Sequence, residues 1–118
     1  MSTQRWVVRL AKVAKVDLRE ILAFSRAKFG AAQTRNYAQT IDDAVRTLRA
    51  GREVLGSRMR RDLGQGLRSL HIARKGRRGR HVLIYRIATQ GTIEIVRILH
   101  ESMDLGRHVA PLHGNEEN

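Results

Sequence analysis

The sequence predicts an α+β fold, in which a helical hairpin packs on an antiparallel β-sheet. Three observations support this class. Residues 93–99 are rich in β-branched residues and apolar on both faces, as in a central strand. Two amphipathic helical stripes precede that stretch, and glycine-containing turns separate further strand-like segments. The expected order is β-α-α-β-β-β, followed by a short C-terminal helical turn.

The first strand and the two helices follow from side-chain periodicity. Residues 6–10 alternate well enough for a strand with Trp6, Val8 and Leu10 facing inward. The sequence allows two starting points for the first helix. Asp17 and Glu20 form a capping-box pattern, but residues 11–16 could already be helical. Gly30 fits the end of that helix. A second helix is expected from about residue 31 to 50, ended by the next glycine, so the two helices form an antiparallel hairpin.

Three strands are expected after the helices. Residues 52–65 read as irregular, and strands then follow at 67–73 and 81–88, with a hairpin turn at 89–91 into the central strand. Regular alternation in the central strand places Ile93, Ile95 and Leu99 on one side and Val96 and Ile98 on the other. The three strands therefore form an antiparallel meander, and the helical hairpin packs on one face of it.

The length of 118 residues indicates one domain, which we expect to cover residues 1–112, with a disordered tail at 113–118. The sequence contains no cysteine, which excludes disulfides and thiolate metal sites. We find neither a secretory signal nor an apolar run long enough for a membrane span. A cytoplasmic protein without membrane association is therefore expected.

The formal net charge is +12, and all but four of the 23 basic residues are arginine. Arginine pairs bidentately with carboxylates and phosphates, so an anionic partner is expected, either nucleic acid or an acidic protein. The basic residues concentrate in two loops and near the C-terminus. These loops are either solvated turns or contacts for nucleic-acid phosphates; the candidates are Arg58, Arg60, Arg61, Lys75, Arg77, Arg78, Arg80 and Arg107.

Polar residues follow the central strand directly. His100, Glu101 and Asp104 could form an acid/base pair or part of a metal site, or they could be the polar end of a core strand with Asp104 capping a helical turn. We favour the structural interpretation, because no second cluster with zinc-like spacing occurs. Neither a metal nor another cofactor is expected.

The chain resembles the RelE/ParE superfamily of small bacterial toxins, and within it the ParE branch. The resemblance covers residues 6–108 and rests on Asp17-Leu18-Arg19-Glu20-Ile21, Phe29-Gly30, Gly66-Leu67-Arg68-Ser69-Leu70 and His81-Val82-Leu83-Ile84-Tyr85-Arg86, and above all on Ile98-Leu99-His100-Glu101-Ser102-Met103-Asp104-Leu105 with Arg107-His108. It implies the toxin of a type II toxin–antitoxin system, a non-enzymatic inhibitor of DNA gyrase. The basic loops would then contact gyrase or DNA held by gyrase.

The resemblance leaves a second function open, because RelE-type relatives are ribosome-dependent mRNA endonucleases. Such chemistry needs basic groups around a pentacoordinate phosphate and an acid/base group. The candidates for it are Arg68, Arg86, Arg97, His100 and His108. Against it, no aromatic residue follows Tyr85, which shares an apolar stripe and is expected to pack in the core. A basic nucleic-acid-binding module without toxicity is a third hypothesis.

The resemblance also implies a partner, an acidic, ParD-like cognate antitoxin that forms a hetero-oligomer with the toxin. A basic domain with an exposed helical hairpin and open sheet edges suits a partner that adds an amphipathic helix and an extended segment. The candidate contacts on the helices are Leu22, Arg26, Arg35 and Arg46.

Overall fold

A computed structural model describes residues 5–74 and 76–109 of the chain. The expected tail at 113–118 lies outside these residues. The elements follow the order β1 (Val7–Leu10), α1 (Lys12–Phe29), α2 (Ala31–Thr47), a 3₁₀ turn (Leu48–Ala50), β2 (Ser57–Met59), β3 (Arg68–His71), β4 (His81–Thr89) and β5 (Thr92–His100). Residues 105–109 form a final helical turn. The predicted α+β class is confirmed.

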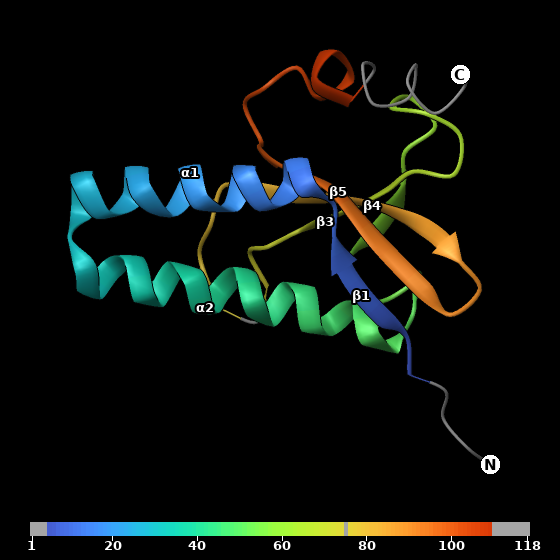
Figure 1. Cartoon of the computed structure of the whole chain (residues 1–118), viewed down its shortest axis with the longest axis horizontal. Helices are drawn as coiled ribbons and strands as arrows, with labels where there is room; N and C mark the ends of the chain where they lie inside the picture. The colour runs from blue at the N-terminus through green and yellow to red at the C-terminus, as the bar shows by residue number, and fades with distance from the viewer. Residues whose placement is uncertain (1–4, 75, 110–118) are drawn as a thin grey trace.

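The strands form one five-stranded sheet in the order β1-β5-β4-β3-β2. β5 lies next to the edge strand β1 and pairs with it in parallel, whereas all other pairs are antiparallel. In Figure 1, α1 and α2 lie side by side and extend past the sheet towards the turn that joins them. Gly30 in that turn has a φ of 88°, a conformation that glycine adopts without strain.

The structure settles where α1 begins and adds a strand. Because α1 starts at Lys12, Asp17 lies inside the helix and cannot cap it, so the capping-box interpretation is wrong. β2 is an extra strand within the stretch expected to be irregular. Its three residues, Ser57, Arg58 and Met59, have no apolar alternation that would reveal a strand. These residues form a strand only because they pair with β3.

A β-bulge in β5 corrects the predicted facing of its side chains. Ile84 pairs with Arg97 and Tyr85 pairs with Ile95, so Val96 is an extra residue in the strand. The alternation therefore changes parity at this point. Ile98, rather than Leu99, continues the face begun by Ile93 and Ile95.

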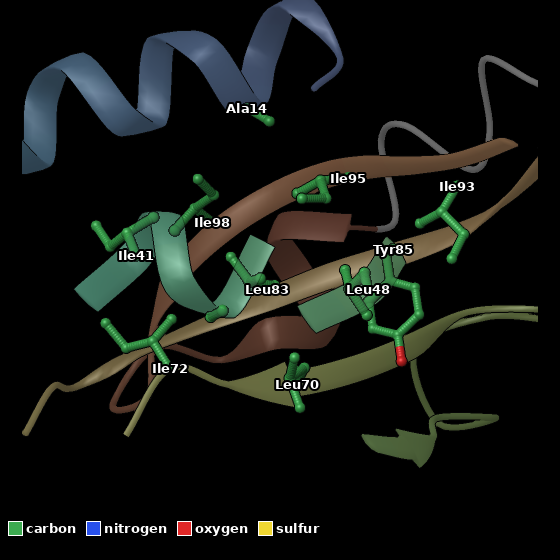
Figure 2. Packing of buried hydrophobic residues seen from close by; sticks show 11 residues of the cluster. Ala14, Ile41, Leu48, Leu70, Ile72, Leu83, Tyr85, Ile93, Ile95 and Ile98 are labelled. Atoms are coloured by element: carbon green, nitrogen blue, oxygen red, sulfur yellow. The ribbon is translucent and has the colours of Figure 1, made fainter. Parts of the chain in front are cut away.

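The bulge lets β5 contribute to two cores on opposite faces of the sheet. The larger core joins the helical hairpin to the sheet, and Figure 2 shows Ile41 of α2 and Leu48 of the 3₁₀ turn over Leu83, Ile95 and Ile98. The smaller core is covered by the loop before β3 and by the final helical turn; it consists of Leu63, Leu67, Val82, Ile84, Val96, Leu99 and Val109. Both faces of β5 are therefore buried, as predicted, and the structure shows that both faces of β4 are buried as well.

Candidate functional site

The predicted basic contacts fall at opposite ends of β3. Arg58 lies on β2, and Arg60 and Arg61 follow it in the loop that leads back to the start of β3. Arg60 is engaged by Asp62 through two hydrogen bonds of 2.9 and 2.7 Å, whereas Arg58 and Arg61 are exposed. Arg107, in the final helical turn, is also exposed. These residues do not form one surface with the loop between β3 and β4.

The loop between β3 and β4 lies against α2. The Arg77 guanidinium is 3.2 Å from side-chain oxygens of Asn36, Thr40 and Asp43, so this arginine anchors the loop to the helix. Arg78 and Arg80 are exposed, and Lys75 lies outside the described residues. Of the four predicted basic contacts in this loop, one therefore has a structural role.

A cluster of titratable side chains lies beside this loop, where β4 begins and β5 ends. The Tyr37 hydroxyl accepts a hydrogen bond from the Arg80 N–H (3.1 Å) and lies 2.6 Å from His81 Nδ1, to which it donates when the neutral imidazole carries its proton on Nε2. The His81 ring meets the His100 ring edge to face, with centroids 5.3 Å apart. Glu101 completes the cluster and accepts a 2.7 Å hydrogen bond from His71 Nε2.

Burial and hydrogen bonding together set the charge of this cluster. Burial, with a smaller repulsion from His100, lowers the pKa of His81 to about 4. Burial also raises the pKa of Tyr37, and the hydrogen bond from His71 lowers the pKa of Glu101. At neutral pH the cluster therefore holds a neutral imidazole and a protonated phenol next to a carboxylate. These groups can exchange a proton with a ligand or orient a polar one.

We expect stability to fall as the pH is lowered from about 6.5, the ordinary pKa of histidine, to about 4, the pKa of His81. In this window the unfolded chain takes up a proton that folded His81 does not bind, so protonation favours unfolding. The facing groups are Tyr37, His71, His100, Glu101 and Arg80. Urea unfolding at pH 7, 5.5 and 4.5 measures this loss, which should be smaller in His81→Gln and unchanged in the exposed control His108→Gln. Equal losses in wild type and His81→Gln would contradict the prediction.

A groove of about 810 Å³ opens beside the cluster, between α1 and the loop that joins β3 to β4. Its helical side carries the exposed rings of Phe24 and Phe29, with the Lys28 ammonium 5.5 and 6.0 Å from their centroids. The opposite side carries Arg78 and Arg80. The groove therefore combines an apolar wall with a cationic wall.

The candidates for a nuclease site are not brought together. Arg97 is bound by Asp17 of α1, with N–O distances of 2.8 and 3.0 Å, and also donates to the His108 carbonyl. His100, at the end of β5, belongs to the cluster, and its Nδ1 accepts from the Ser102 N–H (3.1 Å). His108 lies exposed in the final helical turn.

The other two nuclease candidates lie away from His100. Arg68 donates to the Arg52 carbonyl and to Ser57 Oγ, both at 2.9 Å. Arg86, towards the other end of β4 from His81, is 3.0 Å from Glu94. Arg97 and Arg68 hold the fold together in this structure.

The predicted antitoxin contacts lie along the helical hairpin. Leu22 is half-buried on α1, while Arg26 and Arg35 are exposed near the turn between the helices. Arg46 lies near the end of α2 and pairs with Asp42 at 2.8 Å. Leu22 and Arg26 lie on the same helix as the apolar wall of the groove.

Sequence reasoning missed Tyr37 and His81 as site residues. Tyr37 falls in the apolar stripe of its helix, and nothing local to His81 predicts that it is half-buried, because their contact spans 44 residues. No group of three or more His, Asp or Glu side chains within the described residues is arranged to hold a metal ion. Nor does any described helix have the length and hydropathy needed to cross a membrane.

The family model for the ParE toxin of the type II toxin–antitoxin system parDE matches residues 8–105. The chain belongs to this ParE toxin family. Toxin ParE1 of Caulobacter vibrioides is 32% identical over 86% of this chain and 95% of that protein. Toxin ParE of Escherichia coli is 30% identical over 86% of this chain and 90% of its own. The match thus includes both helices and the whole sheet except the first residue of β1.

Solved structures agree with the ParE fold. A chain of the chromosomal ParDE toxin–antitoxin system from P. aeruginosa has a TM-score of 0.62 at 19% identity, over 82% of this chain and 97% of that chain. A chain of the toxin–antitoxin complex RelBE2 from Mycobacterium tuberculosis has a TM-score of 0.55 at 25% identity, over 86% of this chain and 98% of that chain. The predicted membership of the RelE/ParE superfamily is confirmed.

Proposed function

We propose that this ParE-family toxin inhibits DNA gyrase and is neutralised by an acidic, ParD-like antitoxin. The family match over residues 8–105 carries the proposal. The geometry supports a mechanism by binding rather than by RNA cleavage, since two arginines needed for phosphate chemistry are used structurally. Arg97 is bound by Asp17, and Arg68 holds the Arg52 carbonyl.

The groove beside α1 suits the antitoxin. An acidic amphipathic segment would place apolar side chains on Phe24 and Phe29 and carboxylates opposite Arg78 and Arg80. Leu22 and Arg26 would extend the contact along α1. The high positive charge of the chain favours such a partner by long-range attraction.

A supercoiling assay with purified gyrase tests the first half of the proposal. Increasing toxin should reduce conversion of relaxed to supercoiled plasmid, and pre-incubation with the cognate antitoxin should restore it. Heat-denatured toxin is the control. Full gyrase activity in the presence of excess folded toxin would refute gyrase as the target.

Phe24→Ala tests the groove as the antitoxin site. Phe24 is 64% exposed, so its truncation should leave stability nearly unchanged. Loss of a central aromatic anchor should weaken antitoxin binding by about 1–3 kcal/mol, a factor of roughly 5 to 150 in affinity. Calorimetric titration measures this, with Val7→Ala as the control, because Val7 is 62% exposed on β1 and is not among the residues lining the groove. Equal affinities for wild type and Phe24→Ala would place the antitoxin elsewhere.

A ribosome-dependent mRNA endonuclease is the alternative. The side chains of His81, Tyr37 and His100 beside a groove favour it, because they could act as an acid/base set. Cleavage of mRNA on translating ribosomes that is lost in His100→Ala would support this function over gyrase inhibition. Arg97→Ala is unsuitable for that test, because it would leave Asp17 buried without its partner.

A further inference from the structure

A second hollow, of about 790 Å³, lies at the end of the sheet away from the histidine cluster. The first groove includes His81 at the start of β4, whereas this one includes Tyr85, Arg86 and Ile87 towards the end of that strand. Four arginines contribute to its lining: Arg52, Arg61, Arg68 and Arg86. Glu53 is the one acidic residue among the lining residues.

Hydrogen bonds fix the arginine-bearing segments around this hollow. The Tyr85 hydroxyl (2.7 Å) and Arg68 Nε (2.9 Å) both donate to the carbonyl of Arg52. Arg68 also donates to Ser57 Oγ, which ties it to the edge strand β2. The backbone of Arg52 and the guanidinium of Arg68 are therefore held in defined positions before any ligand binds.

The hollow also has an excess of positive charge. Elsewhere in the described structure, the guanidinium groups of Arg46, Arg60, Arg77 and Arg97 each lie within 3.2 Å of an aspartate carboxylate. Here Glu53 is 3.9 Å from Arg52 and its side chain is 74% exposed, which makes a weak pair. Within the described residues, no ion pair engages Arg61, whose side chain is exposed. Arg86 is engaged by Glu94 and adds less net charge.

The residues that line the hollow favour contact with the phosphate backbone of a nucleic acid over contact with its bases. Tyr85 is fully buried, and the large exposed aromatic side chains, Phe24 and Phe29, lie on α1. Base stacking on a single strand needs exposed rings, so this hollow offers no platform for it. Guanidinium groups pair well with phosphate oxygens of a duplex without reading its sequence.

We propose that this hollow binds the phosphate backbone of double-stranded DNA through the exposed guanidinium groups of Arg52 and Arg61, while Arg68 holds the backbone of Arg52 in place. The site is separate from the groove assigned to the antitoxin, and the proposal does not depend on gyrase being the target. The toxin would then contact DNA directly, in addition to the protein that it binds.

Fluorescence anisotropy of the full-length chain with a labelled 20-base-pair duplex of arbitrary sequence tests the proposal at several salt concentrations. The salt dependence of log K measures the number of phosphates contacted, at about 0.9 per contact. The double variant Arg52→Gln/Arg61→Gln should lower that slope by about two and weaken binding at every sequence tested. Arg52→Lys/Arg61→Lys should retain most of the affinity, and Glu53→Gln should increase it.

The control removes the same charge from the other end of the hairpin. Arg26→Gln/Arg35→Gln lies near the turn between α1 and α2, and the length of α2 separates it from Arg52. It should change the slope by less than half as much. An equal change in the control, tighter binding to single-stranded DNA of the same length, or no binding to duplex would overturn the site. Gyrase inhibition is measured separately, so loss of one property does not imply loss of the other.

Discussion

Replacing Asp17 with alanine should lower the free energy of unfolding by about 3–5 kcal/mol, because it leaves a largely buried arginine without its counter-charge. The Asp17 carboxylate accepts hydrogen bonds from Arg97 Nε and Nη2 and from the Ile98 N–H, at 2.8–3.0 Å. The two side chains are only 11% and 17% exposed. One carboxylate thus joins α1 to β5.

Urea unfolding followed by circular dichroism measures this loss. Asp43→Ala is the matched control, since Asp43 also pairs with an arginine but is 47% exposed, and we expect it to lose less than about 1 kcal/mol. The apolar double variant Asp17→Leu/Arg97→Met should recover much of the stability, because no buried charge is then left unpaired. Similar losses for Asp17→Ala and Asp43→Ala would contradict this role of Asp17.

Local signals were sufficient to predict much of the fold. The stripe of α2, with Tyr37, Ile41 and Leu48, depends only on the helical repeat, and the β4–β5 hairpin depends on a glycine between two β-branched segments. Strand β2 could not be found this way, because three polar or flexible residues carry no pattern. The parallel pairing of β1 with β5 was not predicted either, because it joins residues more than eighty positions apart.

The candidate site was harder to predict than the fold, for the same reason. Arg97 carried a functional interpretation from the resemblance, yet its partner Asp17 is 80 residues away and only the folded chain joins them. Tyr37 and His81 had no local signal beyond their residue types. The side chains that were placed correctly, such as Tyr85 in the core, were those whose own strand pattern determined their environment.

The bulge at Val96 turns the Ile98 side chain into the core beneath the helices, where we expect the second large loss of stability on mutation. Ile98 is 2% exposed in the core beneath the helices, so Ile98→Ala should lower the free energy of unfolding by about 2–5 kcal/mol through loss of burial and formation of a cavity. Leu99 is equally buried but belongs to the core on the other face. Leu99→Ala should therefore have an effect of similar size for a different reason.

Double-mutant cycles with Ile41→Ala on α2 separate the two positions. Ile41 shares the helical core with Ile98, and Figure 2 shows the two side chains near each other. Ile41→Ala and Ile98→Ala should couple by at least about 0.5 kcal/mol, whereas Ile41→Ala and Leu99→Ala should add within about that value. Urea unfolding of the two cycles measures both terms. A strand with regular alternation would put Leu99 under the helix instead, so coupling to Leu99 and not to Ile98 would show that β5 has no bulge.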